Sequence, residues 1–452
     1  MMSEVSSDEE FITSSETESD VWGQEEHVKP QEASSKCSIV SFIMGISLTA
    51  PFITFVCASQ DVLAGTSKPT GLVIIGLTAP SVVLKIVSLC LRQVSQVPRV
   101  FLAFAFVIAG QLCVVFTPHL EGRLAGLCLV SVGTGIGEIS LLIQAAVEFE
   151  EIVLCSFIVG TGVGAILGSV TYVGLTVWLI VDPRTAILVS AIWPPVFLIT
   201  FAVSQGKLTS SRNLNATERL SRIRRSKFEI DCRLTTRWKQ RLYSVWSCSH
   251  HMLLLFLIYF SEYIILTAIL TTLVFDGVGV GPEFSPRGDF EHYVLSTMMG
   301  EFLGRSFISM LRAVAPGFFF NSSPVLAFFP LAETIFLVLA TWFRLVSQVW
   351  IIWLLCFVQG TACGMIFSNS YHIIARRVVS NQVAFNVTLA SILETAGILT
   401  AGLVGLYVES ALKDHCMHHE RNISDCFARD TDSTFWEFGH RLLYEGKTAL
   451  SL

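Results

Sequence analysis

The chain has 452 residues, of which 52% are hydrophobic and only 15% are charged, and its mean hydropathy is +0.62. Soluble domains carry about 25% charged residues, so this composition argues against a water-soluble enzyme, a disordered chain, a nucleic-acid-binding protein and a disulfide-stabilised scaffold. The formal net charge of −6 is concentrated at the start of the chain, because residues 1–36 contain ten acids and two lysines.

The N-terminal segment, 1–37, is acidic, rich in Ser and Thr and poor in apolar residues. Such a segment cannot bury enough surface to fold alone, so we expect it to be disordered. No basic region precedes the first apolar stretch, and we therefore expect that stretch to be an uncleaved membrane helix rather than a signal peptide.

Eleven stretches are apolar enough to cross a membrane. A hydrocarbon core about 30 Å thick needs about 20 apolar residues per helix. The stretches lie at about 38–59, 71–91, 99–117, 123–147, 152–180, 186–204, 249–275, 293–311, 324–343, 348–374 and 382–411. Hydropathy alone rates 293–311 as the weakest, because it contains Glu301 and Arg305. The sequence predicts an all-α polytopic membrane protein with six spans followed by five.

The longest polar connection, 205–248, separates an N-terminal bundle at 38–204 from a C-terminal bundle at 249–411, and a tail follows at 412–452. Major-facilitator transporters have this architecture, in which a basic linker joins two helix bundles. The connection carries eleven Lys and Arg residues, whereas loops on the opposite side carry about one each. The positive-inside rule then places the N-terminus and this connection in the cytosol. The connection can also attract anionic lipid headgroups, although ordinary positive-inside charge is the plainer interpretation.

The C-terminal tail is lumenal in this topology. Asn422 begins a glycosylation sequon, which is functional only on the lumenal side. Cys416 and Cys426 are the close cysteine pair on that side, and a disulfide between them fits an oxidising lumen. The histidines around Cys416 have spacing typical of metal ligands, but we expect no metal there.

Short motifs along the spans occur in a fixed order. They are Ala58-Ser59-Gln60-Asp61-Val62-Leu63, Gly133-Thr134-Gly135-Ile136-Gly137-Glu138, Gly160-Thr161-Gly162, Tyr172-Val173-Gly174-Leu175-Thr176, Tyr259-Phe260-Ser261-Glu262-Tyr263 and Asn369-Ser370-Tyr371-His372. Together they resemble the battenin family of lysosomal membrane proteins over about residues 38–411. The chain departs from that family at Leu48-Thr49 and Val358-Gln359-Gly360, and it lacks the C-terminal prenylation cysteine of the mammalian member.

This resemblance implies a major-facilitator-like fold in the membrane of late endosomes and lysosomes. It implies export of a small lysosomal metabolite, either a glycerophosphodiester or a basic amino acid such as arginine, in support of lysosomal pH homeostasis and autophagy. The alternative is a non-transporting membrane adaptor in endolysosomal vesicle traffic. The expected partners are membrane lipids, a small-molecule substrate, protons and cytosolic trafficking proteins. We expect no enzymatic activity, cofactor or nucleic-acid partner.

Ionisable side chains at membrane depth are the main candidates for function. Each costs from about 2.5 to more than 10 kcal/mol there, so it persists where it is paired, faces a cavity or lies near an interface. The candidates are Lys85, Glu138, Glu262, Glu301, Arg305, Glu333, His372 and Glu394.

Glu138 and Glu262 lie inside apolar runs and can carry protons from an acidic lumen. The structural alternative is that one of them pairs with Lys85 or Arg305. The planar fork of Arg305 suits a phosphate or carboxylate, and the alternative for Arg305 is a salt bridge to Glu301.

An arginine substrate would instead require carboxylates such as Glu262 and Glu394. His372 can titrate between pH 5 and 8, although a histidine hydrogen-bonded at an interface is the plainer interpretation. Lys85, Glu138, Glu262, Arg305, His372 and Glu394 are therefore predicted to form the substrate and proton pathway.

Glycines recur every four residues at Gly160, Gly164 and Gly168. A dinucleotide-binding loop needs a preceding strand, and here the glycines lie within a span. Since this spacing places them on one helix face, it predicts close helix–helix packing.

Overall fold

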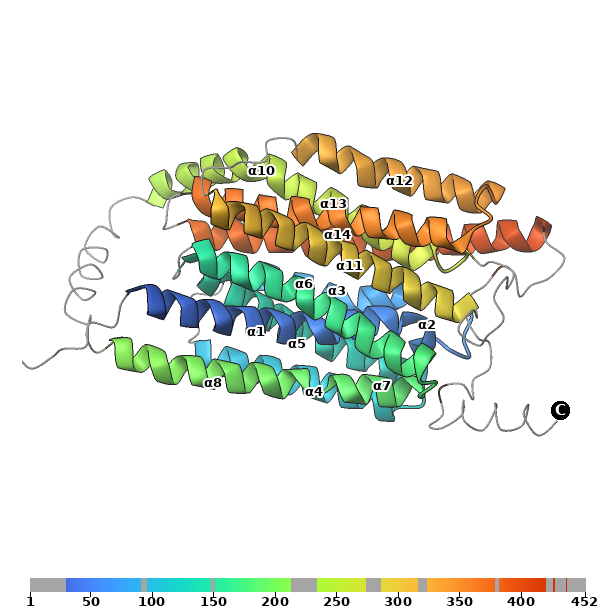
Figure 1. The fold of residues 1–452 in the computed structure, drawn as a ribbon, viewed down its shortest axis with the longest axis horizontal. Helices are drawn as coiled ribbons and strands as arrows, with labels where there is room; N and C mark the ends of the chain where they lie inside the picture. Colours follow the sequence, from blue (N-terminus) through green and yellow to red (C-terminus); the bar gives the residue numbers. More distant parts are fainter. Residues whose placement is uncertain are drawn as a thin grey trace, which may run out of the picture.

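The computed structural model describes residues 30–90, 96–147, 151–212, 234–273, 286–315, 323–378 and 382–419, together with Cys426 and Trp436. Every regular element within these residues is helical, which confirms the all-α prediction. Long helices run side by side along the longest axis of the molecule (Figure 1).

The helices before the basic linker are called the N-terminal helices. They are α1 (Pro30–Cys57), α2 (Ser59–Val62), α3 (Gly71–Cys90), α4 (Gln96–Phe116), α5 (Leu120–Val147), α6 (Glu151–Val173) with the π-helical turn η1 (Gly174–Trp178), α7 (Pro183–Ser190) and α8 (Trp193–Arg212). The C-terminal helices are α10 (Leu234–Ile264) with the π-helical turn η2 (Ile265–Ile269), α11 (Pro286–Val314), α12 (Ser323–Phe343), α13 (Val349–Arg377) and α14 (Val383–His419).

Ten helical stretches in the described part of the chain are long and apolar enough to cross a membrane. The remaining expected span, 293–311, lies in α11, which packs between α6 and α13. Its charged side chains are buried inside the bundle, whereas Met299, Leu303, Phe307 and Met310 are exposed. A hydropathy average hides this division, because the charged face and the apolar face are counted together.

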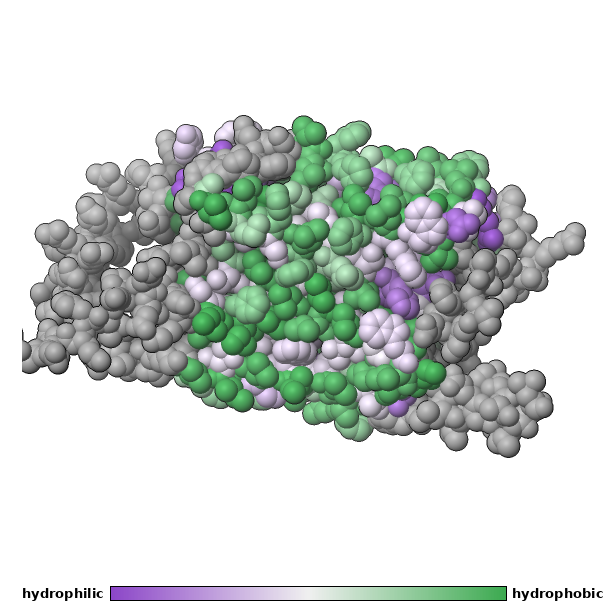
Figure 2. All heavy atoms as spheres, viewed as in Figure 1, coloured by the Kyte–Doolittle hydropathy of each residue, from purple (hydrophilic) through white to green (hydrophobic). Residues whose placement is uncertain are grey.

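Apolar side chains cover the middle of the face shown in Figure 2. This band matches the ten apolar stretches, so the chain is a multi-pass membrane protein. We call the end of the bundle at which α8 ends and α10 begins the linker end, and the end at which α14 finishes the tail end (Figure 1). Between the N-terminal and C-terminal helices, α3 and α5 pack against α14, and α6 packs against α11.

The glycine face of α6 packs directly on α1. A Cβ atom added at Gly164 would lie 2.6 Å from the carbonyl oxygen of Ile46, and one added at Gly168 would lie 2.5 Å from that of Ala50. These backbones approach as closely as the absence of side chains allows. The helix-packing interpretation of the glycine spacing is therefore confirmed.

Replacing Gly164 by alanine is expected to destabilise the protein, because the new methyl group meets backbone atoms of α1 that cannot rotate away. Overpacking of this kind costs about 1–3 kcal/mol. The matched control is Gly76→Ala, whose Cβ would make only an ordinary contact with Leu127, at 3.5 Å. Thermal unfolding of the detergent-solubilised proteins measures the difference, and equal midpoints for the two variants would contradict it.

Candidate functional site

A cavity of about 110 Å³ lies between the N-terminal and C-terminal helices. Its wall combines side chains of α1, α3, α5 and α6 with side chains of α10, α11, α13 and α14. The aromatic part of the wall consists of Phe52, Phe157, Tyr259, Tyr263, Phe367 and Tyr371. The charged part consists of Glu138, Glu301, Arg305 and Glu394. A mostly apolar wall with a few convergent polar groups is typical of small-molecule sites.

Lys85 of α3 ties the N-terminal helices to α14. Its ammonium group donates to Glu138 Oε2 at 2.8 Å, to Ser391 Oγ at 2.7 Å and to Thr395 Oγ1 at 2.6 Å. Ser391 also donates to Glu138 Oε1 at 2.5 Å. Lys85 is fully buried, whereas the side chain of Glu138 is 29% exposed. Glu138 is thus paired with Lys85, and its carboxylate faces the cavity.

Arg305 of α11 makes the corresponding connection to α6. Its guanidinium donates to Thr161 Oγ1 at 2.6 Å and to the hydroxyl of Tyr259 at 3.0 Å, and it forms an ion pair with Glu301. It also lies over the ring of Phe367, 4.2 Å from the centroid. Arg305 therefore pairs with the acid four residues before it, as the alternative interpretation of the sequence predicted.

The two cations occupy equivalent places in the architecture. Lys85 lies on α3, which packs on α14, and Arg305 lies on α11, which packs on α6. Each cation reaches across to hydroxyl groups of the opposing helix and holds a carboxylate at the cavity wall. The central site is thus bounded by one buried cation from each set of helices.

Glu394 lines the cavity from α14, and its carboxylate accepts a hydrogen bond from the Tyr371 hydroxyl at 2.6 Å. Glu262 is different, since it does not line the cavity. Its side chain is only 1% exposed, and the donor that faces its carboxyl group is the weakly donating thiol of Cys363 on α13. It lies behind the cavity wall, next to Tyr263 in the chain, and pairs with neither Lys85 nor Arg305.

His372 lies outside the cavity, near the linker end of α13. It is buried, and its Nε2 lies 3.4 Å from the sulfur of Cys155 on α6. Of the six residues predicted for the pathway, the structure thus brings Lys85, Glu138, Arg305 and Glu394 together at the cavity. It places Glu262 behind the wall and His372 toward one end.

A second set of polar contacts joins the N-terminal and C-terminal helices at the tail end. Thr176 of η1 donates to Glu291 of α11 at 2.6 Å, and the backbone N–H of Thr70 donates to Glu409 of α14 at 2.6 Å. All four residues are buried. Glu291 is missing from the sequence-based candidates because it lies just before the predicted span 293–311, and Glu409 because it lies near the end of the predicted span 382–411.

The tail residues Cys416 and Cys426 form a disulfide, with Cα atoms 5.7 Å apart. Trp436 follows in the chain and is buried at the tail end of the N-terminal helices. Arg123 of α5 and Arg184 of α7 lie 4.7 Å and 5.4 Å from the centre of its ring. Asn422 lies outside the described residues. Within the described part of the chain, no three His, Cys, Asp or Glu side chains are grouped to hold a metal ion.

Comparison with known proteins gives consistent matches over most of the chain. A family model described as "CLN3 protein" matches residues 39–415. Protein BTN1 of Candida glabrata is 26% identical over 412 residues, covering 84% of this chain and 97% of that protein. Protein BTN1 of Saccharomyces cerevisiae is 25% identical over 405 residues, covering 84% and 96%.

Among solved structures, the chain is similar to the POT family transporter PepTSo, with a TM-score of 0.54. The similarity covers 92% of this chain and 98% of the transporter, at 10% sequence identity. At this identity the likeness concerns the fold alone. It is the fold of a major-facilitator-type transporter, as the sequence predicted.

Proposed function

This chain belongs to the CLN3 protein family, and from that premise we propose that it is a lysosomal carrier that exports a small metabolite together with protons. The observation that supports transport most directly is the central cavity, which both sets of helices line and which contains Glu138, Glu301, Arg305 and Glu394. In the proposed orientation the linker end faces the cytosol and the tail end faces the lumen.

The chemistry of the wall favours a glycerophosphodiester over arginine. A guanidinium substrate needs a carboxylate that is not already engaged, but Glu138, Glu301 and Glu394 each accept from Lys85, Arg305 or Tyr371. A phosphodiester needs a cation at the cavity wall, and the positively charged side chain of Arg305 lines the cavity. Aromatic rings in the wall add favourable faces for a choline headgroup.

Glu262 supports the coupling to protons. A carboxylate buried with only a weak donor is costly, whereas a carboxylic acid in the same place is neutral. We propose that Glu262 takes up a proton in the conformation open to the lumen and releases it in the conformation open to the cytosol. Its neighbour Tyr263 lines the cavity, so movement of the wall and protonation of Glu262 are linked.

Replacing Glu262 by glutamine is expected to preserve folding and delivery to lysosomes but to remove the pH dependence of export. Glutamine keeps the shape of the side chain and cannot bind the proton. Glu262→Lys should be worse, because it adds a buried cation to a region that already holds Arg305. Clearance of glycerophosphodiesters from lysosomes lacking the endogenous protein is the measurement.

The control for this experiment is Glu121→Gln, because Glu121 is exposed at the start of α5. Normal clearance is expected for this variant. If Glu262→Gln restored clearance fully at normal expression, with the same pH dependence as the wild type, its proton role would be disproved.

The alternative function is a non-transporting adaptor in endolysosomal traffic, acting through the acidic N-terminus and the basic linker. That function predicts buried acids that are scattered through the bundle and individually paired. Three of the acids, each of them paired, converge on one cavity wall instead of being scattered, and this convergence is why we favour transport. Comparison of metabolites in lysosomes with and without the protein separates the two functions. If the protein is an adaptor, small-molecule export is unchanged in its absence once vesicle traffic is restored.

A further inference from the structure

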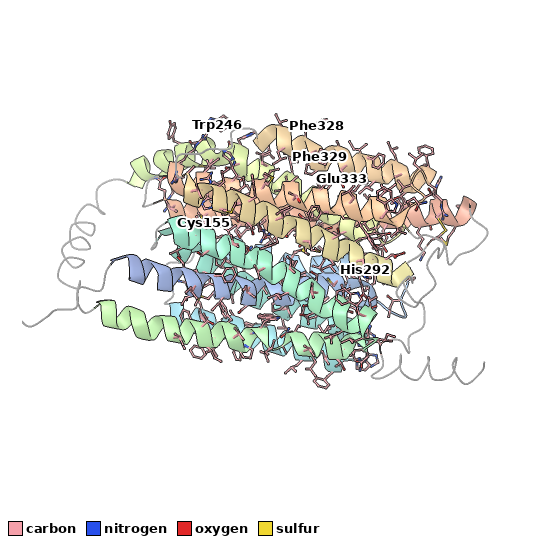
Figure 3. The ribbon with its side chains drawn as sticks, viewed as in Figure 1. Cys155, Trp246, His292, Phe328, Phe329 and Glu333 are labelled. Atoms are coloured by element: carbon pink, nitrogen blue, oxygen red, sulfur yellow. A yellow bond between two sulfur atoms is a disulfide. The ribbon has the colours of Figure 1, made fainter. Side chains whose placement is uncertain are left out.

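Glu333 is the one charged residue of α12, and it lies at the midpoint of that helix. The neighbouring Phe328 and Phe329 are 73% and 47% exposed, so this part of α12 borders the surface of the bundle (Figure 3). The side chain of Glu333 is only 5% exposed. A carboxyl group is therefore held at membrane depth on the inner side of a peripheral helix, away from the central cavity.

A polar layer surrounds this position between α10, α12 and α13. The hydroxyl of Ser261 lies 2.8 Å from the carbonyl oxygen of Pro330 and 2.6 Å from Thr334 Oγ1, and it accepts from Gln359 Nε2 at 3.1 Å. Gln359 is 1% exposed. We call Ser261, Glu262, Glu333, Thr334 and Gln359 the rear layer, because it lies behind the wall of the cavity.

The rear layer contains more acceptors than its donors satisfy. Both carboxyl oxygens of Glu333 and the Oε1 of Gln359 have no hydrogen-bond partner among the described residues, and the carboxyl group of Glu262 faces the weakly donating thiol of Cys363. The hydroxyls of Ser261 and Thr334 are directed to Pro330 or to each other. An ionised carboxylate with no donor is strongly disfavoured at such a place. A carboxyl group that carries its own proton is neutral and becomes a donor itself.

No basic side chain supplies the missing donor. The ionisable groups that face Glu262 are Glu301 and Arg305 of α11, Glu394 of α14 and the thiol of Cys363 of α13, and Arg305 is already paired with Glu301. Those that face Glu333 are the thiols of Cys356 and Cys363. Within the described part of the chain, Glu333 forms no ion pair and no hydrogen bond. The available counter-charge for Glu333 is therefore a proton.

We infer that Glu333 is a second proton-binding carboxyl of this protein, working with Glu262 in the rear layer and separate from the substrate cavity. The inference rests on the proposed proton-coupled export. In the chemical step a carboxylate takes up one proton to become a carboxylic acid and later returns it, with no other bond changed. Since two carboxyls bind protons, more than one proton accompanies each substrate molecule.

The experiment uses the full-length protein in proteoliposomes with glycerophosphocholine as the probe. For a given substrate gradient, we measure the pH gradient at which net substrate movement stops. The ratio of these two gradients gives the number of protons moved per substrate molecule. We expect this number to fall in Glu333→Gln, while substrate exchange at equal pH on both sides is retained. The matched control is Thr341→Val, which removes a hydroxyl of the same helix that lies outside the rear layer and bonds to the carbonyl oxygen of Leu337, and which should leave the number unchanged.

Infrared difference spectra of the purified protein at acidic and neutral pH provide a readout that needs no transport. The wild type should show a protonated carboxyl band that disappears as pH rises, and part of this band should be missing in Glu333→Gln. If the wild type moves no substrate, the proposed function fails, and the infrared result still decides the proton site. An unchanged proton number together with an unchanged infrared band in Glu333→Gln would overturn the inference.

A variant that keeps the acid covers the case in which Glu333→Gln does not fold. Glu333→Asp retains a titrating carboxyl on a shorter side chain, so its infrared band should titrate at a different pH from that of the wild type. A spectrum identical to that of the wild type would again overturn the inference.

Discussion

Substitution of Arg305 by alanine is expected to abolish binding of glycerophosphocholine and to destabilise the bundle. Arg305 holds Thr161 of α6, Tyr259 of α10 and Glu301 of its own helix. Its removal leaves Glu301 buried without its cation, and breaking a buried pair in this way costs about 3–5 kcal/mol. Binding of radiolabelled glycerophosphocholine to the purified protein, with thermal unfolding in detergent, measures both effects.

Arg305→Lys separates charge from geometry. Lysine keeps the positive charge, so Glu301 remains compensated and we expect the variant to fold. It cannot present the planar fork that reaches several acceptors together, so binding of the phosphodiester should be weaker than in the wild type. Wild-type binding by the alanine variant would contradict the assignment of Arg305 as the anion site.

Replacing Lys85 by alanine is expected to release α14 from α3 and α5. Lys85 is fully buried and bonds to Glu138, Ser391 and Thr395. Each buried polar group left without a partner costs about 1–3 kcal/mol. We therefore expect a large fall in the unfolding temperature and low expression at the lysosomal membrane, both measured against wild type at equal transcript level.

The double variant Lys85→Met with Glu138→Gln tests whether the cost comes from the unpaired charge. Replacing both members of a buried pair by neutral groups of similar size is much less harmful than removing one. Stability should recover substantially relative to Lys85→Ala, while pH-dependent export stays impaired. If the double variant were less stable than Lys85→Ala, packing alone would explain the role of Lys85.

The helices could be predicted from sequence because a membrane span is recognised by its length and its apolar content. The least certain span, 293–311, shows the limit of that signal, since buried Glu301 and Arg305 lowered an average that the exposed Leu303 and Phe307 raised. The family resemblance supplied the order of the motifs. It did not supply the rotation of each helix about its axis.

That missing rotation explains why the sequence alone left the pairing of the buried acids open. From sequence, Glu138 and Glu262 were equal candidates for the cations, because both lie at similar depth in apolar runs. The structure turns Glu138 toward Lys85 and the cavity, and it turns Glu262 away from the cavity. Ser391 and Thr395 had no distinguishing signal, since hydroxyl residues are common in membrane helices, yet they complete the coordination of Lys85.

The position of Trp436 has a mechanical consequence. The residue belongs to the chain that continues from α14 and the Cys416–Cys426 disulfide, yet its ring is seated against Arg123 and Arg184 of the N-terminal helices. The chain after α14 thus contacts the N-terminal helices at the tail end, where the Thr176–Glu291 hydrogen bond also joins the two sets of helices. Opening of the bundle at this end breaks that hydrogen bond and works against the seating of the indole on two guanidinium groups. One buried tryptophan therefore adds to the resistance against opening at this end.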